Sequence, residues 1–575
     1  MNIYLPLHRR WDVLVVGSGI AGLAAALEAA GAGRAVALIT GARLFSGSSF
    51  YPGTWGLGLI GPENEADQAD LVDTIQTVGC HMATQALAEE FVAGIAPAIE
   101  GVRRMGVKLR RAVQKDQREF IPCFDHKGRD WNGLEFDSLR EVFSRRLEEL
   151  GVTVLEGCEA LRLEKAGERV CGLTAHYRGE LVYLGCKALV LATGGYGSLF
   201  RYHLCTDDVA GQGQAMALEA GCSLVNMEFM QMMPGYISPA PKTIFNEKTF
   251  RFVEMRKGDG TPLLPEGEES RRLLELRSGH GPFTARLDSR EVDLALFRAF
   301  LEDPAGVEVT YSEELRRDPP EFITTYFDWL KEAKGLTMDD PIRVGVFAHA
   351  ANGGVAIGPD ASTGVPGLFA CGEVTGGMHG ADRIGGLSTA NGLVFGGKAG
   401  RSAAAFCEEA PLPPDGVEFE GLAALRTEGV LEELQEIMFR HAMVIRTGEG
   451  LSRALARVDE LEEELTLQPS DDPAAIARSR RLLGQLSTAR CILRAALLRR
   501  ESRGSHHRED FPHTDPAQKK QILVRLRRRG YRPAFGNKEA PLPPKKRKGE
   551  CIHDLYHQGT SGPLQGLLRQ SGHRH

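Results

Sequence analysis

The sequence predicts an α/β fold with a Rossmann-like domain, an inserted α+β capping domain and a C-terminal helical domain. Three observations predict it. A glycine-rich βαβ pattern occupies residues 11–40, and stretches rich in Pro and Gly turns interrupt the chain after residue 233. Apolar residues then recur every three or four positions over residues 417–500, which indicates helices. A chain of 575 residues has room for several such domains.

The overall composition is that of an ordinary soluble globular protein. Hydrophobic residues make up 42% and charged residues 25% of the chain. The formal net charge of -7 argues against a nucleic-acid partner. The N-terminal stretch has no apolar signal-peptide core, and no apolar run approaches the roughly 20 residues that a membrane helix needs. We therefore expect a cytoplasmic protein without a transmembrane segment.

The 11 cysteines are scattered through the chain, and no two of them form a CxxC pair. This spacing provides neither a disulfide framework nor the ligand pattern of a zinc or iron–sulfur site. We expect no metal site, and the cysteines should be buried or idle thiols. Any electrons that the protein handles should therefore leave by another route.

The clearest local signal is WDVLVVGSGIAGLAAALEAAGAGRAVALIT at 11–40, a strand, a G-x-G-x-x-G turn, a helix and a second strand. Gly17 permits the tight turn, Gly19 lets the backbone approach a pyrophosphate, and Gly22 packs the helix on the strand. The acid expected after the second strand is a threonine here, so ribose recognition falls to a hydroxyl, to backbone groups or to a later residue. The residues expected to bind a dinucleotide in this unit are Gly17, Ser18, Gly19, Ala21, Gly22 and Thr40.

Further glycine-rich loops follow other apolar runs. One is LFSGSSFYPGTWGLGLIG at 44–61, whose hydroxyls and backbone N–H groups suit a flat, polar cofactor. The others are CKALVLATGGYG at 186–197 and TGVPGLFACGEVTGGMHG at 363–380. Loops of this kind at the ends of separate strands suit one extended ligand across the carboxyl edge of a sheet. The candidate binding residues in the first two of these loops are Ser48, Ser49, Thr193, Gly194 and Gly195.

Taken together, these segments resemble the succinate dehydrogenase/fumarate reductase flavoprotein family, in particular its L-aspartate oxidase-like members. The residues that carry the resemblance are VVGSGIAGL, SGSSFY, LATGGYG, VPGLFACGEVTGGMHGADRIGG and ESRGSHHREDFP. The segment LQEIMFRHAMVIRTGEGL is similar to the start of that family's C-terminal helical domain. The resemblance runs from about residue 11 to residue 512, with a break in the middle.

The resemblance implies FAD as the cofactor. Family members that attach FAD covalently use a histidine in the Ser-rich loop, and this loop has none, so non-covalent FAD is expected. Glu373 matches the family position near the flavin ribose. Asn391, close to Ser388 in the STANG segment, stands where the family has a glutamate; an amide can still donate and accept hydrogen bonds there. Ser388 and Asn391 complete the expected cofactor contacts.

The resemblance also divides the chain. We expect a split FAD-binding domain, an inserted capping domain that closes over the flavin, a helical domain and a basic, weakly structured tail. A solvated extension is favoured for this tail over a contact with a partner or nucleic acid. The expected boundaries are 11–232 and 345–408 for the FAD-binding domain, 233–344 for the cap, 417–512 for the helical domain and 513–575 for the tail.

Two residues matching family motifs are expected to face the substrate. Arg383 lies in HGADRIGG, where the family's arginine clamps the substrate and takes part in proton movement. A guanidinium is a poor acid or base, with a pKa above roughly 12, but it binds a carboxylate through two hydrogen bonds without any such shift. His349, in FAHAANGG, matches the family's substrate-binding histidine before a Gly-Gly pair.

Besides Asn391, three further features depart from the family pattern. Met233 replaces a second site histidine, and a thioether can neither donate a strong hydrogen bond nor carry a charge. The capping motif RGEGG is missing, and its nearest counterpart, RKGDG at 256–260, offers Arg256 as a third candidate catalytic residue. Asp382 stands where the family has an amide. Arg503 and Arg508, near the adjacent His506 and His507, are expected to have structural roles.

These observations predict an FAD-dependent oxidoreductase that acts on a small carboxylate or amino acid. One alternative is the flavoprotein component of a multi-subunit redox complex, with an iron–sulfur or quinone electron-transfer partner. A second alternative, motivated by the methionine and the missing capping motif, is a flavin-binding protein with lost or altered catalysis.

Overall fold

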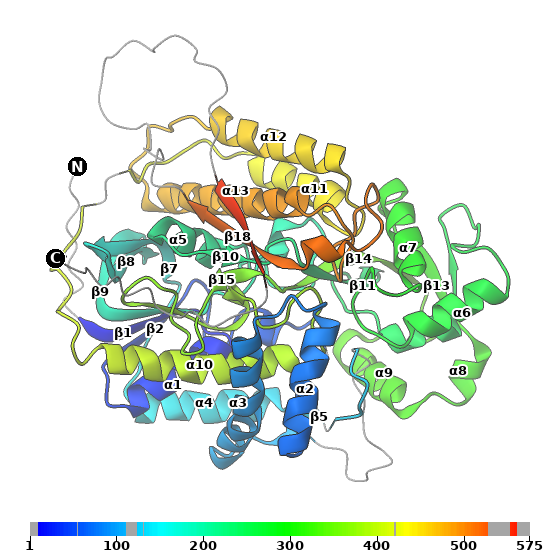
Figure 1. Ribbon diagram of the computed structural model, residues 1–575, viewed down its shortest axis with the longest axis horizontal. Coiled ribbons are helices and arrows are strands. Elements are labelled where there is room, and N and C mark those ends of the chain that lie inside the picture. The colour runs from blue at the N-terminus through cyan, green and yellow to red at the C-terminus, as the bar shows by residue number, and fades with distance from the viewer. Residues whose placement is uncertain are drawn as a thin grey trace, which may run out of the picture.

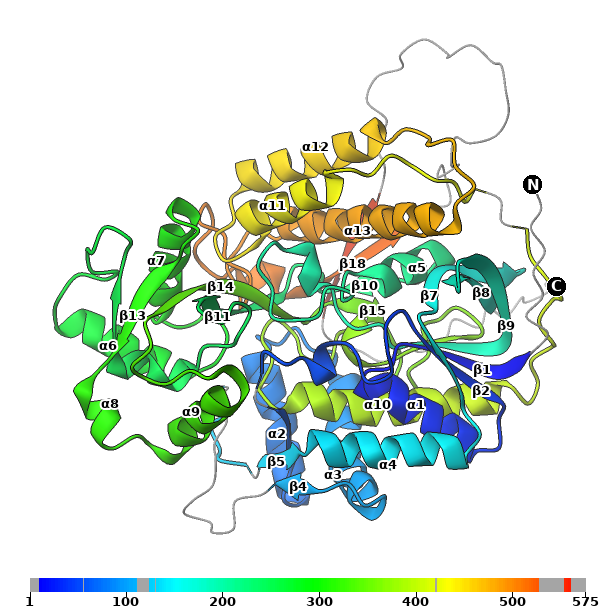
Figure 2. The same ribbon diagram turned by 180° about the vertical axis from the view of Figure 1, so that it is seen from behind.

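The structure is a computed structural model that describes residues 10–54, 56–110, 124–129, 131–418, 421–526 and 553–559. A central part carries the N-terminal βαβ unit, the capping part projects from one end, and three helices cover another face (Figure 1, Figure 2). None of the described helices has the length and hydrophobicity that crossing a membrane requires. The described cysteines are free and buried, and no group of three acidic, His or Cys side chains in the described ranges could hold a metal.

The main sheet has seven strands in the order β6-β2-β1-β9-β8-β7, with β16 paired to β9. Strands β6, β2, β1, β9 and β16 run parallel, and β7 and β8 add an antiparallel extension. The near-continuous apolar runs of β1 and β2 are buried on both faces, as a parallel sheet covered by helices requires. The bounds are β1 Trp11–Val16, β2 Val36–Thr40, β6 Thr153–Glu156, β7 Glu159–Ala166, β8 Arg169–Tyr177, β9 Glu180–Leu191 and β16 Leu368–Ala370.

Helix α1, Ile20–Gly31, packs closely on α10, Leu387–Phe406. The contact is close because α10 presents glycines: a Cβ on Gly396 would lie 2.5 Å from the Ala21 carbonyl oxygen. The expected strand–helix–strand order of residues 11–40 is confirmed. Four more helices surround this part of the chain, namely α2 Glu65–Val78, α3 Gln85–Arg104, α4 Phe136–Glu149 and α5 Gln212–Ala220.

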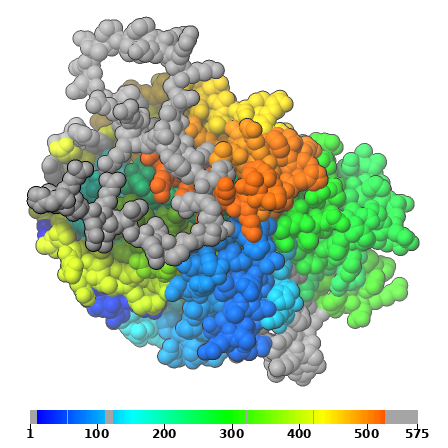
Figure 3. Space-filling model, viewed as in Figure 1, coloured from blue at the N-terminus to red at the C-terminus, as the bar shows by residue number. Residues whose placement is uncertain are grey.

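The capping part is built on a four-stranded antiparallel sheet in the order β11-β14-β13-β12. Its core includes Tyr236, Tyr311 and Tyr326; the hydroxyl of Tyr236 lies 3.4 Å from that of Tyr311 and 3.3 Å from that of Tyr326. In the space-filling view the cap lies against the C-terminal region on one side and against the α2 region on the other (Figure 3). The bounds are β11 Met230–Ser238, β12 Val253–Arg256, β13 Val307–Tyr311, β14 Ile342–Ala351, α6 Glu268–Arg277, α7 Arg290–Glu302, α8 Glu313–Arg317 and α9 Glu321–Lys334.

The helical region contains α11 Val430–Ala442, α12 Gly448–Glu464 and α13 Pro473–Leu498. The start of α13 is the one that the sequence indicates: the Asp472 carboxylate accepts a hydrogen bond from the Ala474 N–H, and Pro473 follows. In both ribbon views the three helices stack over the central part, with α13 innermost (Figure 1, Figure 2).

Two small sheets complete the fold. One has the order β3-β5-β4, and the other has the order β17-β15-β10-β18-β19. A weakly structured tail was expected to include residues 520–526, but these residues form strand β18, which pairs with β10. The alternating sequence QILVRL places the buried side chains of Ile522 and Val524 on one face of this strand. The rest of that tail lies largely outside the described residues. The bounds are β3 Leu57–Ile60, β4 Leu109–Arg110, β5 Trp131–Leu134, β10 Leu224–Val225, β15 Gly354–Ala356, β17 Thr375–Gly376, β18 Lys520–Leu526 and β19 His553–Gly559.

Candidate active site

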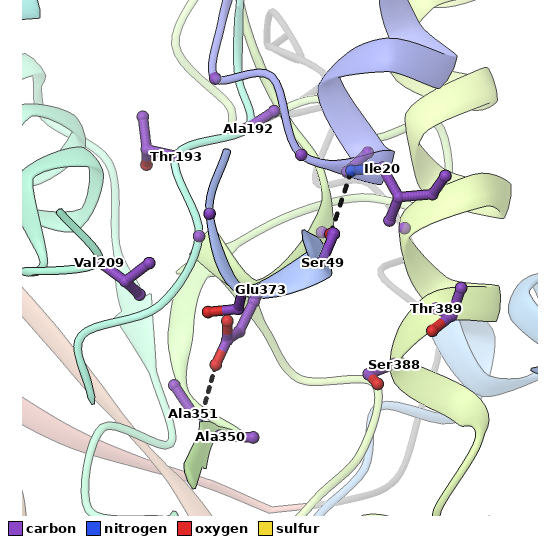
Figure 4. Close-up of a pocket in the computed structure, with 18 of the residues that line it drawn as sticks. Ile20, Ser49, Ala192, Thr193, Val209, Ala350, Ala351, Glu373, Ser388 and Thr389 are labelled. Atoms are coloured by element: carbon purple, nitrogen blue, oxygen red, sulfur yellow. Dashed lines mark hydrogen bonds between the residues drawn. The ribbon is translucent and has the colours of Figure 1, made fainter. Parts of the chain in front are cut away.

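A cavity of about 640 Å³ lies where the carboxyl ends of β1, β2 and β9 meet the capping strands β11 and β14. Most of the residues expected to bind the cofactor line it. They are Gly17, Ser18, Gly19, Ala21, Thr40, Ser48, Ser49, Thr193, Gly194, Glu373, Ser388 and Asn391. Figure 4 shows several of them on the cavity wall, contributed by segments far apart in the sequence. Gly22 and Gly195 are the two expected residues that do not line it.

The βαβ turn has the geometry that its glycines predict. Gly17 has φ +113°, and a Cβ there would lie 2.3 Å from the Ala192 carbonyl oxygen. A Cβ on Gly22 would lie 1.8 Å from the Gly17 carbonyl oxygen, so this glycine allows helix α1 to pack on the turn. The Ile20 N–H at the helix N-terminus donates to the Ser49 hydroxyl at 3.2 Å, which joins the turn to the Ser-rich loop (Figure 4).

Several buried polar atoms in this cavity have no hydrogen-bond partner among the described residues. They are Ser48 Oγ, Thr193 Oγ1 and Asn391 Oδ1. Because a buried polar atom costs free energy when it is unpaired, such atoms indicate a polar ligand. Together with the N-terminus of α1 they fit a flavin dinucleotide, which needs donors and acceptors at its phosphates, ribose and ring edge.

Glu373 lies between the cofactor loops and the capping strand. Its carboxylate accepts a hydrogen bond from the Ala351 N–H at 2.8 Å (Figure 4) and a second one from the Gly195 N–H at 3.2 Å. Burial raises the pKa of Glu373, while these two N–H groups and the charge of Arg383 oppose the rise. The carboxylate therefore joins the loop after β9 to β14 in addition to lining the cavity.

Arg383 lies in the loop before α10, with 8% of its surface exposed, and it lines the same cavity. Its Nε donates to Gln231 Oε1 at 3.0 Å, and Gln231 Nε2 donates back to the Arg383 carbonyl oxygen at 3.1 Å. The strand β11 thus orients the guanidinium. Sequence reasoning missed Gln231, although it lies two residues before Met233 and therefore on the same face of the strand.

His349 reaches the cavity through a β-bulge. Met232 pairs with Ala348 and Gln231 with Ala350, so His349 is the extra residue on β14. Burial, and next the charge of Arg383, lower the pKa of His349 to about 3, so the imidazole is neutral at physiological pH. Its Nδ1 is buried and has no hydrogen-bond partner within the described part of the chain.

His379 is a second imidazole of the cavity that sequence reasoning did not single out as a site residue. It packs edge-on against Phe91, and its Nε2 lies 3.5 Å from the Asn391 amide. Burial, and next Arg383, lower its pKa to about 3. Its position within HGADRIGG is the signal that could have identified it. The cavity thus combines a buried guanidinium with two neutral imidazoles.

The structure does not bring Arg256 to this cavity. It ends β12, the outer strand of the capping sheet, where its side chain is about half exposed and donates to the Gly260 carbonyl oxygen at 3.1 Å. The RKGDG segment forms a surface turn, so this arrangement does not support a catalytic role for Arg256. Met233 does line the cavity, as an apolar part of the wall on β11.

Hydrogen bonds from the cap and from residues 501–512, called here the C-terminal segment, hold the loop that carries Arg383. The Asp382 carboxylate accepts hydrogen bonds from Thr284 Oγ1 at 2.7 Å and Arg286 Nε at 2.9 Å, both on the capping segment. Ser505 Oγ donates to the Ala381 carbonyl oxygen at 2.9 Å. The cap and the C-terminal segment therefore both fix the backbone next to Arg383.

Two arginines of the same C-terminal segment are held in ion pairs. Arg503 pairs with Glu501 at 2.7 Å and Arg508 with Asp510 at 2.8 Å, and neither lines the cavity. The C-terminal segment therefore supports the site without lining it.

Comparison with known proteins agrees with this geometry. The model of the FAD binding domain family matches residues 12–389, and that of the fumarate reductase flavoprotein C-terminal domain matches residues 431–547. L-aspartate oxidase of Mycobacterium leprae is 30% identical over 90% of this chain and 95% of its own length. A fumarate reductase (CoM/CoB) component of Methanothermobacter marburgensis is 27% identical over 89% of this chain and 96% of its own.

A solved structure shares the fold over most of its length. Mycobacterium smegmatis Sdh1 in complex with UQ1 superimposes with a TM-score of 0.74 at 25% identity, covering 90% of this chain and 92% of that one. The cofactor of this chain is FAD. The chain belongs to the succinate dehydrogenase/fumarate reductase flavoprotein family and is an FAD-dependent oxidoreductase of that type.

Proposed function

We propose that the enzyme oxidises or reduces a small carboxylic or amino acid whose carboxylate binds to Arg383. The observation that carries the proposal is the buried guanidinium that Gln231 orients at the cavity. A buried cation in a partly apolar cavity favours an anionic ligand, and a guanidinium matches a carboxylate through two parallel hydrogen bonds. The names of the two relatives, L-aspartate oxidase and fumarate reductase, point to the same chemical class.

The cofactor and the residues of the cavity have separate roles in this reaction. FAD, when bound, supplies the acceptor or donor of a hydride. Arg383 holds the substrate carboxylate, and His349, neutral beside it, donates one hydrogen bond without adding a second charge. Oxidation of the acid also releases a proton, and Arg383, His349 and His379 are cavity residues that can carry it.

The test is an anaerobic screen of carboxylic and amino acids against the purified yellow enzyme, with the loss of flavin absorbance as the readout. We expect at least one acid to reduce the flavin. Arg383→Ala should slow that reduction ~30–150-fold, because a lost charged contact costs about 2–3 kcal/mol in the transition state. Arg256→Ala, an exposed arginine of the cap, is the matched control and should leave the rate unchanged.

Equal rates for Arg383→Ala and the wild type would contradict the assignment of Arg383. Failure of every acid to reduce the flavin would instead favour lost or altered catalysis. Met233, an apolar side chain on this wall of the cavity, motivates that second interpretation.

The reduced flavin must pass its electrons to an acceptor. We propose that a quinone or an iron–sulfur protein, rather than oxygen, reoxidises the flavin. Support comes from two relatives by name: one solved relative is Sdh1 in complex with UQ1, and another is one component of a fumarate reductase. Rapid reoxidation of the reduced enzyme in air would contradict a dedicated partner. Reoxidation only by a ubiquinone analogue or by a separate protein fraction would support one.

A further inference from the structure

We propose that Phe124 is a positioning residue that acts on the loop of Arg383 from outside the cavity. Its ring holds Arg286 of the cap, which is paired with Asp382 in that loop. The inference rests on the proposed function, because an effect on turnover requires the substrate carboxylate to bind at Arg383. Phe124, Arg286 and Asp382 do not line the cavity, so this arrangement lies behind the site.

Residues 124–129 are fixed to helix α2 by a buried arginine. The Arg129 side chain is 1% exposed, and its guanidinium pairs with three aspartates, namely Asp67 at 3.0 Å, Asp70 and Asp125. Because a buried guanidinium is costly without such partners, the three carboxylates hold it in one place. Asp67 and Asp70 belong to α2, so residues 124–129 keep their position relative to that helix.

Phe124, at the start of these residues, contacts the cap from an unfavourable backbone conformation. Its φ of +65° lies in the left-handed region, which bulky residues seldom adopt. Its ring stacks on the imidazole of His280, with 5.1 Å between the centroids and 16° between the planes. The guanidinium carbon of Arg286 lies 5.0 Å from the centroid of the same ring. A strained conformation persists only where surrounding contacts hold it, which directs attention to these two contacts.

His280 is a fixed and neutral partner of this ring. Its Nδ1 lies 2.9 Å from the Pro282 carbonyl oxygen, and its Nε2 lies 2.8 Å from Ser289 Oγ. Burial, and next the charge of Arg277, lower the pKa of His280 to about 2, so the imidazole is uncharged at physiological pH. The cation that the ring meets is therefore Arg286, and an aromatic face attracts a guanidinium held over it.

Arg286 connects this ring with the loop of Arg383. Its Nε donates to the Asp382 carboxylate at 2.9 Å, and the Asp382 side chain is fully buried. The loop is also tied directly to the end of α2, since the Ala381 N–H donates to the Gly79 carbonyl oxygen at 3.0 Å. Loss of the aromatic face would let Arg286 change its rotamer, and the cap would then hold this loop less firmly.

The first test measures anaerobic flavin reduction in the holoenzyme at a saturating concentration of the acid found in the screen. Phe124→Leu keeps an apolar side chain without an aromatic face, and reduction should slow ~10-fold, because small displacements of a positioned group are costly in rate. Phe124→Tyr keeps the aromatic face and should stay within ~2-fold of the wild type. Phe252→Leu, which changes a ring under Arg251 elsewhere on the cap, is the matched control and should leave the rate unchanged.

The second test does not depend on a substrate. Burial raises the pKa of Asp382 to about 6, while Arg286 and the Thr284 hydroxyl oppose the rise. Cys80, on the turn after α2, also faces this carboxyl, and burial raises the pKa of its thiol to about 12, so it stays uncharged. The stability contributed by Asp382 is lost as pH rises through its folded pKa. A weaker contact with Arg286 should therefore move the end of this loss to higher pH.

Denaturant midpoints at several pH values locate this point, as the difference in free energy of unfolding caused by Asp382→Asn. In the Phe124→Leu background it should lie at least ~0.5 pH unit higher than in the wild-type background, whereas Phe124→Tyr should leave it in place. A side chain that only adds apolar packing would not move it.

The route through Arg286 is tested by combining substitutions. Arg286→Gln removes the cation over the ring and should itself slow flavin reduction. The double variant Phe124→Leu/Arg286→Gln should be no slower than Arg286→Gln alone, because residues that act through one contact have non-additive effects.

A wild-type rate or an unshifted pH dependence in Phe124→Leu would overturn the inference. Effects that multiply in the double variant would also overturn it, since Phe124 would then act by another route. If no acid reduces the flavin, the pH dependence decides alone. Each of these failures leaves the proposed function intact as long as Arg383→Ala slows reduction, whereas loss of that effect would contradict the proposed function itself.

Discussion

Arg383 and Gln231 hold each other through two hydrogen bonds, one at 3.0 Å from Arg383 Nε to Gln231 Oε1 and one at 3.1 Å from Gln231 Nε2 to the Arg383 carbonyl. The two residues are 152 positions apart in the chain, on a loop of the FAD-binding part and on a strand that enters the cap. One carboxamide therefore fixes both the backbone and the side chain of this arginine. The orientation of the guanidinium depends on how the two parts are joined.

Replacing Gln231 should weaken turnover without removing the flavin. Gln231→Leu keeps the approximate volume and removes both hydrogen bonds, so Arg383 loses its orientation. We expect kcat/KM for the acid found in the screen to fall ~10–100-fold, which corresponds to about 1.4–2.7 kcal/mol. Gln85→Leu, which removes an exposed amide at the start of α3, is the control. Unchanged kcat/KM in Gln231→Leu would show that the orientation of Arg383 does not depend on this pair.

Asp382 should make stability depend on pH. Burial raises its pKa to about 6, and the contacts from Arg286 and Thr284 only partly oppose the rise. In the unfolded chain the carboxyl titrates near its ordinary value of 3.8. The folded protein therefore holds a proton that the unfolded chain has lost between about pH 4 and 6. Stability from this group falls as pH rises through that window and is constant above it.

Asp382→Asn removes this titration and restores the amide of the family pattern. The difference in free energy of unfolding between variant and wild type should change by about 2–3 kcal/mol across roughly pH 4–6 and stay constant above about pH 6. Denaturant midpoints at several pH values measure it. Asp137→Asn, which replaces a fully exposed carboxylate, is the control, and its difference in free energy of unfolding from the wild type should not vary with pH. A difference for Asp382→Asn that does not vary with pH would refute the assignment.

The parts of the molecule that local sequence patterns encode were predictable, and the parts that depend on packing were not. The turn at Gly17 and the helix start at Asp472 depend on neighbours in the chain, so spacing alone located them. Arg256 illustrates the limit: its similarity to a motif predicts a site residue, but the strand that carries it, β12, lies at the edge of the capping sheet. Gln231 was outside the reach of local patterns, because its role depends on the packing of β11 against the loop that carries Arg383.

The FAD should be released when the protein is denatured. No histidine occurs in the Ser-rich loop 44–61 beside the cofactor turn. Cys158, a cysteine of the cavity wall, has its pKa raised to about 12 by burial, so its thiol stays protonated and unreactive. Acid precipitation should therefore leave all flavin absorbance in the supernatant. A yellow pellet would contradict non-covalent binding, and a flavoprotein with covalent FAD serves as the positive control.

The geometry of the first glycine should decide whether FAD binds. Gly17 has φ +113°, and a Cβ there would lie 2.3 Å from the Ala192 carbonyl oxygen, which is backbone and cannot move aside easily. Gly17→Ala should therefore purify with less than ~10% of the wild-type flavin content, because the turn that receives the pyrophosphate is displaced. Gly31→Ala is the matched control: it lies at the end of the same βαβ helix, and nothing lies within 4 Å of its added Cβ. The ratio of flavin to protein absorbance measures both variants, with circular dichroism to show that each is folded. Full flavin occupancy in Gly17→Ala would mean that the turn tolerates a side chain and that the pyrophosphate binds elsewhere in the cavity.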